Sequence, residues 1–302
     1  MAEPAASSNR TGFVKIRDGL KLHVGHWPAP RSTKRPVLCL PGLTRNGRDF
    51  AVIAAALSDG PEGREVFTLD ARGRGLSDRD PDWHNYSLPT ETQDVIDIMA
   101  ALGLHDAAIL GTSRGGLVSM ILAAVQPGLI GAIVLNDIGP VIERTGLTRI
   151  AGYVGRMPLP LSWDDATRMV ADISRKAFPA VPDSAWPIVA RAWFNESDGR
   201  PAPGYDAALG KSFSSTDATP PALWAQFGAL KNAAMLVVRG ETSDLLSDAT
   251  VAEMQSRHPN CARLKVKGEG HAPLLMDKPT IEVIRAFYDT ADTGQSVAGV
   301  VY

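Results

Sequence analysis

The residues best suited to chemistry lie in the segment 111–115, which reads Gly-Thr-Ser-Arg-Gly. An apolar run at 107–110 precedes this segment and helical spacing follows at 117–125, so we expect Ser113 on a tight turn from a strand into a helix. Side chains at the two glycine positions would clash in such a turn. The turn lifts the serine hydroxyl above the sheet edge, beside the free N–H groups of a helix N-terminus, which favour a developing oxyanion. Ser113 is therefore a candidate nucleophile.

A serine nucleophile needs a base, and His271 is the best placed of the six histidines. It lies in the segment 268–273, Gly-Glu-Gly-His-Ala-Pro, directly after the apolar run 262–266. The glycines beside it allow the loop to bring the imidazole to the same sheet edge as Ser113. We expect structural roles for the other five histidines, at positions 23, 26, 84, 105 and 258.

A histidine base needs a carboxylate that fixes its tautomer and stabilises the imidazolium. The first candidate is Asp244, just past the run 235–238, and the alternative is Asp137, just past the run 132–135. The chain order Ser113, Asp244, His271 is the order expected when the nucleophile lies on a turn from a strand into a helix.

Short apolar runs and helical segments alternate along the chain and must position these side chains. The runs lie at 13–16, 20–27, 37–40, 66–69, 107–110, 132–135, 235–238 and 262–266, and helical spacing at 49–57, 92–104, 117–125 and 280–288. Most of the runs are continuously apolar, which is typical of strands buried on both faces. We therefore predict an α/β protein with a mainly parallel sheet covered by helices on both faces. The carboxyl ends of its strands share one edge, where ligands bind.

The alternation stops between residues 141 and 219, a stretch rich in proline that shows no clear strand. We predict a helical cap insertion at 141–219, a core formed by 11–140 and 220–290, and flexible tails at 1–10 and 291–302.

The elbow at Ser113 and two further segments resemble the α/β-hydrolase superfamily, in its capped branch of esterases, lactonases, C–C bond hydrolases and epoxide hydrolases. The resemblance runs from about residue 19 to residue 288. It includes the segment 69–78, which is similar to the strand-end turn D-x-R-G-x-G-x-S of that family. A serine at position 113 disfavours the dehalogenase and epoxide-hydrolase chemistries, because these use a carboxylate nucleophile.

The resemblance also implies roles for the segment 40–44, Leu-Pro-Gly-Leu-Thr, as the first oxyanion loop. It implies an oxyanion hole made by the backbone N–H groups of Leu43 and Arg114. It favours Asp244 as the acid, because the G-x-x-S-D-x-L setting is the one that the family most often uses. Pro41 stands where the family usually has a histidine, so the loop must be held in another way.

Two sets of side chains could select the substrate. Aromatic residues of the insertion either line an apolar pocket or form the core of the cap: Trp163, Phe178, Trp186, Trp193 and Phe194. Arg45, Arg114 and Arg191 either bind a substrate carboxylate or are solvated surface charges. The sequence does not choose between these alternatives.

The composition excludes several classes of protein. A formal net charge of −2 argues against a nucleic-acid binder, and no apolar run is long enough to span a bilayer. Two cysteines and the lack of a signal peptide indicate the cytoplasm. The histidines lack metal-ligand spacing and no glycine loop fits a phosphate, so we expect neither a metal nor an organic cofactor. No pattern indicates the oligomeric state.

These observations predict a serine hydrolase of a small or medium carboxylic ester or lactone, which works through an acyl-enzyme. The first alternative is a hydrolase that cleaves a carbon–carbon bond in a dienoic or diketone acid with the same triad. The alternative from another class is a non-catalytic ligand-binding protein on a hydrolase fold.

Overall fold

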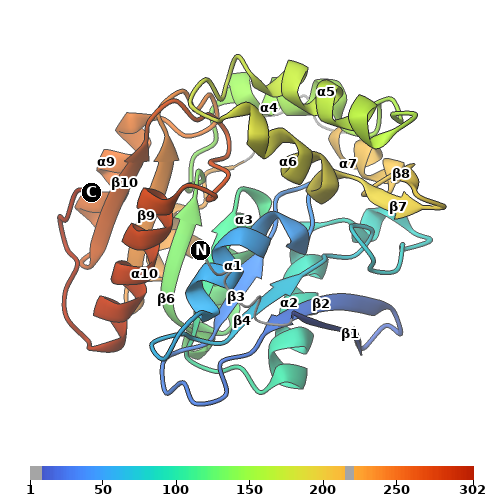
Figure 1. The fold of residues 1–302 in the computed structure, drawn as a ribbon. Coiled ribbons are helices and arrows are strands. Elements are labelled where there is room, and N and C mark those ends of the chain that lie inside the picture. The colour runs from blue at the N-terminus through green and yellow to red at the C-terminus, as the bar shows by residue number, and fades with distance from the viewer. Residues whose placement is uncertain (1–8, 215–220) are drawn as a thin grey trace.

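The computed structural model describes residues 9–214 and 221–302, and its centre is one eight-stranded sheet (Figure 1). The strand order is β1-β2-β4-β3-β5-β6-β9-β10. β2 pairs antiparallel with β1 and with β4, and the other neighbours pair in parallel. The bounds are β1 (Arg10–Lys15), β2 (Lys21–Trp27), β3 (Val37–Leu40), β4 (Val66–Leu69), β5 (Ala107–Thr112), β6 (Ile130–Asn136), β9 (Ala234–Gly240) and β10 (Cys261–Val266). The predicted α/β class and its mainly parallel sheet are confirmed.

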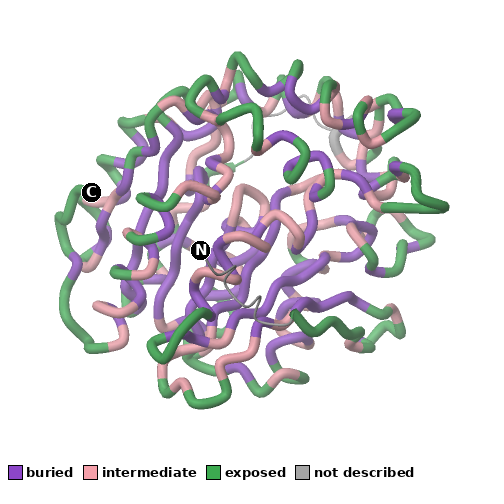
Figure 2. The backbone as a smooth tube through the Cα atoms, viewed as in Figure 1, coloured by how far each residue is buried: buried purple, intermediate pink, exposed green. Residues whose placement is uncertain are grey.

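Helices cover both faces of the sheet because successive strand residues point to opposite sides. On one side, Val37 and Cys39 pack in the cluster that contains α1 (Ala51–Ser58) and α10 (Lys278–Asp292). On the other side, Leu38 packs with helices α2 (Leu88–Leu102), α3 (Arg114–Val125), α8 (Trp224–Gly228) and α9 (Asp248–Arg257). The central strands are consequently buried along their length (Figure 2). The sequence patterns did not indicate α9.

Local capping explains where the longer helices begin and end. Ser87 caps α2 by accepting a hydrogen bond from the Thr90 N–H, and Gly103, with φ of 66°, ends that helix in the left-handed conformation. Asp277 caps α10 in the same way through the Thr280 N–H.

The helices α4 to α7, which follow β6, form a cap over the carboxyl ends of the strands (Figure 1). The cap contains α4 (Arg144–Tyr153), α5 (Trp163–Ser174), α6 (Trp186–Trp193) and α7 (Lys211–Ser214). It also contains a small hairpin of β7 (Asn195–Ser197) and β8 (Arg200–Ala202), so the expectation that the insertion holds no strand is wrong. These strands have three residues each, too few to produce a readable alternation.

The C-terminal tail is packed rather than loose. The helix α10 continues to Asp292, and Val297 is fully buried. The Arg263 N–H of β10 donates to the Val300 carbonyl at 3.0 Å, and the Tyr302 N–H donates back to the Arg263 carbonyl at 3.0 Å. Backbone hydrogen bonds to an edge strand order this tail, which we expected to be loose because it is small and polar until its last few residues. The first eight residues of the predicted N-terminal tail, and the predicted boundary at 219–220, lie outside the described residues.

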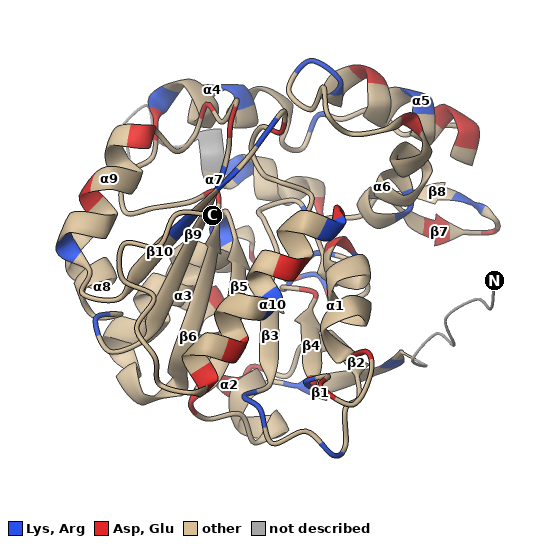
Figure 3. Ribbon diagram, turned by 60° about the vertical axis from the view of Figure 1, so that its left-hand side comes forward, with Lys and Arg blue, Asp and Glu red and all other residues tan. Residues whose placement is uncertain are grey.

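Acidic and basic residues are interspersed along the helices visible in Figure 3. In the described ranges, every helix is too short or too polar to cross a membrane.

Candidate active site

Ser113 lies between β5 and α3 with φ of 50° and ψ of −114°, a backbone conformation that a residue with a side chain adopts only under strain. The flanking glycines explain how the turn closes. A Cβ at Gly115 would lie 2.1 Å from the Leu40 carbonyl oxygen, and a Cβ at Gly111 would lie 2.8 Å from the Gly116 nitrogen. The chain therefore approaches β3 and itself more closely than any other residue type permits.

His271 reaches this serine from the loop that follows β10. Its Nε2 lies 2.9 Å from the Ser113 Oγ, and its side chain is only 7% exposed. The loop is held at two further points: the Leu274 N–H donates to Glu269 Oε2 at 2.8 Å, and Asn136 Nδ2 donates to the Pro273 carbonyl at 3.0 Å. Burial raises the pKa of Glu269 to about 7.

The carboxylate next to His271 is Asp137, at the end of β6. Its Oδ2 lies 2.8 Å from His271 Nδ1, and the side chain is completely buried. Two further donors hold the carboxylate: the Gly240 N–H donates to Oδ1 at 2.8 Å, and Ser243 Oγ donates to Oδ2 at 2.5 Å. Ser113, His271 and Asp137 thus form one continuous hydrogen-bonded chain.

The prediction that Asp244 contacts His271 is wrong. Asp244 instead accepts two hydrogen bonds from Arg149 of the cap helix α4, at 2.6 and 2.8 Å. The hydrogen bond from Arg149 lowers the pKa of Asp244 against the opposing effect of burial. Both aspartates follow neighbouring parallel strands, but Asp137 comes directly after β6, where its N–H donates to the Val238 carbonyl of β9. Asp244 lies four residues beyond the end of β9, past a turn, and points to the cap.

The two expected oxyanion donors lie beside the serine. Arg114 is the first residue of α3, and Leu43 lies in the loop after β3. A Cβ at the neighbouring Gly42 would lie 3.8 Å from the Ser113 Cβ, so this loop passes close to the serine. Neither N–H donates to a backbone carbonyl within 9–214 or 221–302.

The family model of the alpha/beta hydrolase fold matches residues 35–278, most of the chain. The protein belongs to the α/β-hydrolase fold family. It is 31% identical over 298 residues to a 3-hydroxybutyrate-oligomer hydrolase of Cupriavidus necator. This match covers 95% of this chain and 100% of the relative. An α/β hydrolase of Novosphingobium aromaticivorans superposes with a TM-score of 0.86 and 37% identity, covering 95% of this chain and 99% of the other. A 2-(acetamidomethylene)succinate hydrolase of Mesorhizobium japonicum is 27% identical over 252 residues, which is 82% of this chain and 86% of the relative.

In this hydrolase the aromatic residues of the insertion form the core of the cap. Phe178, Trp186 and Phe194 are buried in one cluster, and Trp163 and Trp193 pack against it.

The three arginines considered for substrate binding each face a carboxylate of the protein. Arg45 pairs with Asp49, Arg114 with Glu91 and Arg191 with Glu196. Arg45 also stacks over Trp193, with its guanidinium carbon 4.2 Å from the ring centre. In the described part of the chain, no group of three or more His, Cys, Asp or Glu side chains is placed to hold a metal ion.

The sequence analysis of this hydrolase did not single out Ser243, Asn136 or Glu269. Asn136 directly precedes Asp137, and Ser243 directly precedes Asp244. Both therefore lie in segments that the sequence had already indicated as candidates for the acid. Glu269 lies two residues before His271 in the loop that the histidine had identified.

Proposed function

We propose that the protein is a serine hydrolase of carboxylic esters, in which Ser113 is the nucleophile, His271 the general base and Asp137 the acid of the triad. The observation that carries this proposal is the chain of two hydrogen bonds, 2.9 Å from Ser113 Oγ to His271 and 2.8 Å from His271 to Asp137. A buried carboxylate that accepts from Nδ1 selects the tautomer in which Nε2 accepts the serine proton.

The first half of the reaction follows from this arrangement. Ser113 Oγ attacks the ester carbonyl carbon while His271 Nε2 takes the hydroxyl proton. The carbonyl oxygen becomes an oxyanion and accepts hydrogen bonds from the N–H groups of Leu43 and Arg114. The intermediate then collapses, His271 gives its proton to the departing alkoxide, and the acyl group stays on Ser113.

The second half repeats these roles with water. His271 removes a proton from a water molecule that attacks the acyl carbon, and the same two N–H groups stabilise the second oxyanion. Collapse of this intermediate returns the proton to Ser113 Oγ and releases the acid. Asp137 keeps its charge throughout and stabilises the imidazolium that forms in each half.

For the substrate we propose a small or medium ester, with oligomers of 3-hydroxybutyrate as the first compounds to assay. The full-length similarity to a 3-hydroxybutyrate-oligomer hydrolase supports this choice. Esters that link hydroxy acid units present the same carbonyl chemistry to Ser113. Lactones remain within the proposal, because their ring ester reacts by the same steps.

The carbon–carbon hydrolase remains the enzymatic alternative, since the same triad can serve it. Its elbow usually reads G-N-S-M-G-G, whereas this chain has Thr112 and Arg114 around the serine. A hydrolysis screen distinguishes the two: p-nitrophenyl esters of several chain lengths, lactones, 3-hydroxybutyrate dimer and trimer, and one dienoic diketone. Turnover of the diketone alone would overturn the ester proposal.

A fluorophosphonate probe tests the nucleophile directly. We expect the wild type to be labelled and Ser113→Ala not to be labelled. Ser119→Ala is the matched control, because Ser119 lies in α3, the helix that begins directly after Ser113, but is fully buried, and its hydroxyl donates to the Gly115 carbonyl. An unlabelled wild type would favour the non-catalytic ligand-binding protein.

The proposed reaction uses neither a metal nor an organic cofactor. We therefore expect dialysis against EDTA to leave the rate of ester hydrolysis unchanged. A loss of rate that added zinc or manganese restores would contradict this expectation.

A further inference from the structure

The two proposed oxyanion donors belong to separate parts of the fold, yet buried side chains connect them. Leu43 lies in the loop after β3, where proline replaces the histidine that usually pins this loop. The Leu43 carbonyl accepts a hydrogen bond of 2.8 Å from Arg74 Nε. Arg74 comes from the turn after β4, at a variable position of the D-x-R-G-x-G-x-S segment.

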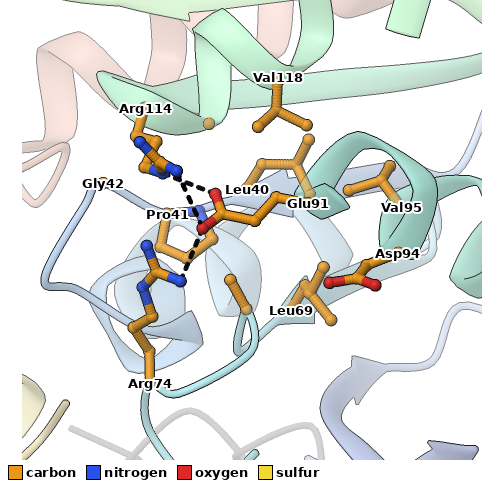
Figure 4. Close-up of a pocket in the computed structure, with 12 residues that line it drawn as sticks. Leu40, Pro41, Gly42, Leu69, Arg74, Glu91, Asp94, Val95, Arg114 and Val118 are labelled. Carbon is orange, nitrogen blue, oxygen red and sulfur yellow. Dashed lines mark hydrogen bonds and ion pairs between the residues drawn. The ribbon is translucent and has the colours of Figure 1, made fainter. Parts of the chain in front are cut away.

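Glu91 of α2 joins this arginine to the second donor residue (Figure 4). Its Oε1 lies 2.7 Å from Arg74 Nη1, and its Oε2 lies 2.6 Å from Arg114 Nε. Arg114 Nη2 adds a bond of 3.1 Å to the same carboxylate and one of 3.0 Å to the Tyr86 carbonyl. The chain of contacts therefore runs without a gap from the Leu43 carbonyl to the Arg114 side chain.

All three side chains are withdrawn from water. The exposed fractions are 1% for Arg74, 5% for Glu91 and 15% for Arg114. Burial favours the neutral acid, but the guanidiniums of Arg114 and Arg74 outweigh it and hold the pKa of Glu91 below its ordinary value. Glu91 thus remains a carboxylate, which can accept from both arginines at once. Buried ion pairs contribute little net stability compared with a well-packed apolar core, so stability alone gives a weak reason for this cluster.

The contacts hold the backbone on both sides of Leu43. The peptide that carries the Leu43 N–H also carries the Gly42 carbonyl, which accepts from the Arg45 N–H at 3.1 Å. The next peptide carries the Leu43 carbonyl, which Arg74 holds. With both peptide planes restrained, the direction of the Leu43 N–H is restrained as well.

We propose that the side chains Arg74, Glu91 and Arg114 form a brace that fixes the two oxyanion donors, the N–H groups of Leu43 and Arg114, relative to each other. Arg74 and Glu91 are positioning residues: they do not touch the substrate, and they act through the backbone of the donors. This inference rests on the proposed function, because it assigns a geometric task within the same site. It also explains how the loop keeps its shape with proline at position 41.

The test uses Arg74→Lys, Arg74→Met and Glu91→Gln in the full chain. Arg74→Lys keeps a positive charge next to Glu91, but a single ammonium cannot reproduce the fork that reaches both Glu91 and the Leu43 carbonyl. We expect each variant to lower kcat for a p-nitrophenyl ester about 10- to 100-fold with KM changed less than threefold, because a displaced donor weakens transition-state binding. Affinity for a trifluoromethyl ketone, which forms a tetrahedral oxyanion on the serine, should fall by the same factor as kcat.

Asp94→Asn is the matched control. Asp94 is also buried in α2, one turn from Glu91, and it pairs with Arg72 at 2.5 Å. Within the described residues, the hydrogen bonds and ion pairs of these two side chains reach none of Leu43, Arg74 and Arg114. Both carboxylates line the same small cavity of about 20 Å³. We expect Asp94→Asn to lower Tm while kcat and ketone affinity stay within threefold of the wild type.

Three outcomes would overturn the brace. The first is an unchanged kcat in all three variants, and the second is a loss of kcat in Asp94→Asn as large as that in Glu91→Gln at an equal loss of Tm. The third is a fall in kcat without a matching fall in ketone affinity. The double variant Arg74→Lys/Glu91→Gln should be scarcely slower than either single variant, because the two residues act as one unit. Fluorophosphonate labelling of every variant separates this proposal from the function itself. A wild type that is not labelled removes the proposed function, whereas labelled variants with wild-type kinetics remove only the brace.

Discussion

Two loops at the same edge of the sheet each carry an aspartate, and they use it differently. The loop after β6 buries Asp137 completely, with hydrogen bonds to His271, Gly240 and Ser243. In the loop after β9 the Asp244 side chain is 29% exposed and forms an ion pair with Arg149 of the cap. The comparison shows that, of the two carboxylates past a strand end, the one that the backbone directs at the histidine is the one that bonds to it.

The two loops are also connected. Ser243, next to Asp244 in sequence, donates to the carboxylate of Asp137 and accepts from the N–H groups of Leu245 and Leu246. The loop after β9 therefore donates a hydrogen bond to Asp137 of the other loop, while its own Asp244 bonds to the cap. The cap contact is reinforced where the Gly146 N–H of α4 donates to the Asp244 carbonyl at 3.0 Å.

The largest effect on kcat should come from Ser113 and His271, the proposed nucleophile and base. We expect Ser113→Ala and His271→Ala each to lower kcat by about 10⁵- to 10⁶-fold, and the double variant to be scarcely worse than either one, because residues of one catalytic unit are not additive. Steady-state kinetics of the three variants measure this. If the two losses multiplied in the double variant, Ser113 and His271 would not share a step. The comparison of Asp137 with Asp244 as partners of His271 would then say nothing about catalysis.

The next largest effect should distinguish the two aspartates. We expect Asp137→Asn to lower kcat about 10⁴-fold, as the equivalent change does in a triad serine protease, because the amide favours the wrong imidazole tautomer. Asp244→Asn should lower kcat less than tenfold, since it removes only a partly screened charge near His271. Circular dichroism checks that both variants fold. If Asp244→Asn were the crippling change, the assignment of the acid would be reversed.

A smaller effect should reveal how the loop after β9 supports Asp137. We expect Ser243→Ala to lower kcat about tenfold, because a hydrogen bond to a charged group contributes roughly 1.5–3 kcal/mol. Ser247→Ala is a control in the same segment, because Ser247 caps α9 and does not contact Asp137. Equal losses in both serine variants would indicate general loosening of the loop.

The smallest effect should appear in stability. The pKa of Asp244 is lower in the folded protein than in the unfolded chain, so its ion pair with Arg149 stabilises the fold above the unfolded pKa, near 4. This contribution is lost as the pH falls through the folded pKa. We expect Asp244→Asn to reduce the free energy of unfolding by about 0.5 kcal/mol at pH 7 and by less below pH 4, measured by urea denaturation. A difference that grows in acid would contradict the assigned ion pair.

The sequence by itself determined the parts of this hydrolase that depend on local constraints. The glycines around Ser113 and the apolar run before it specify the elbow, because no other residue type fits the close approach to Leu40. Continuous apolar strands specify a sheet buried on both faces. The position of His271 in the loop directly after the last strand places it at the same sheet edge as Ser113. Each of these features is encoded within about ten neighbouring residues.

Only the tertiary structure decided which aspartate meets His271. Both candidates follow strands at the catalytic edge, and their distances to the imidazole depend on the register of β6 against β9, the left-handed turn at Asp137 and the cap arginine that pairs with Asp244. The same holds for the contacts from Leu43 through Arg74 and Glu91 to Arg114, which join the loops after β3 and β4 to helices α2 and α3. Contacts between segments so far apart in the chain arise from the packing of strands and helices, which no local pattern of residues records.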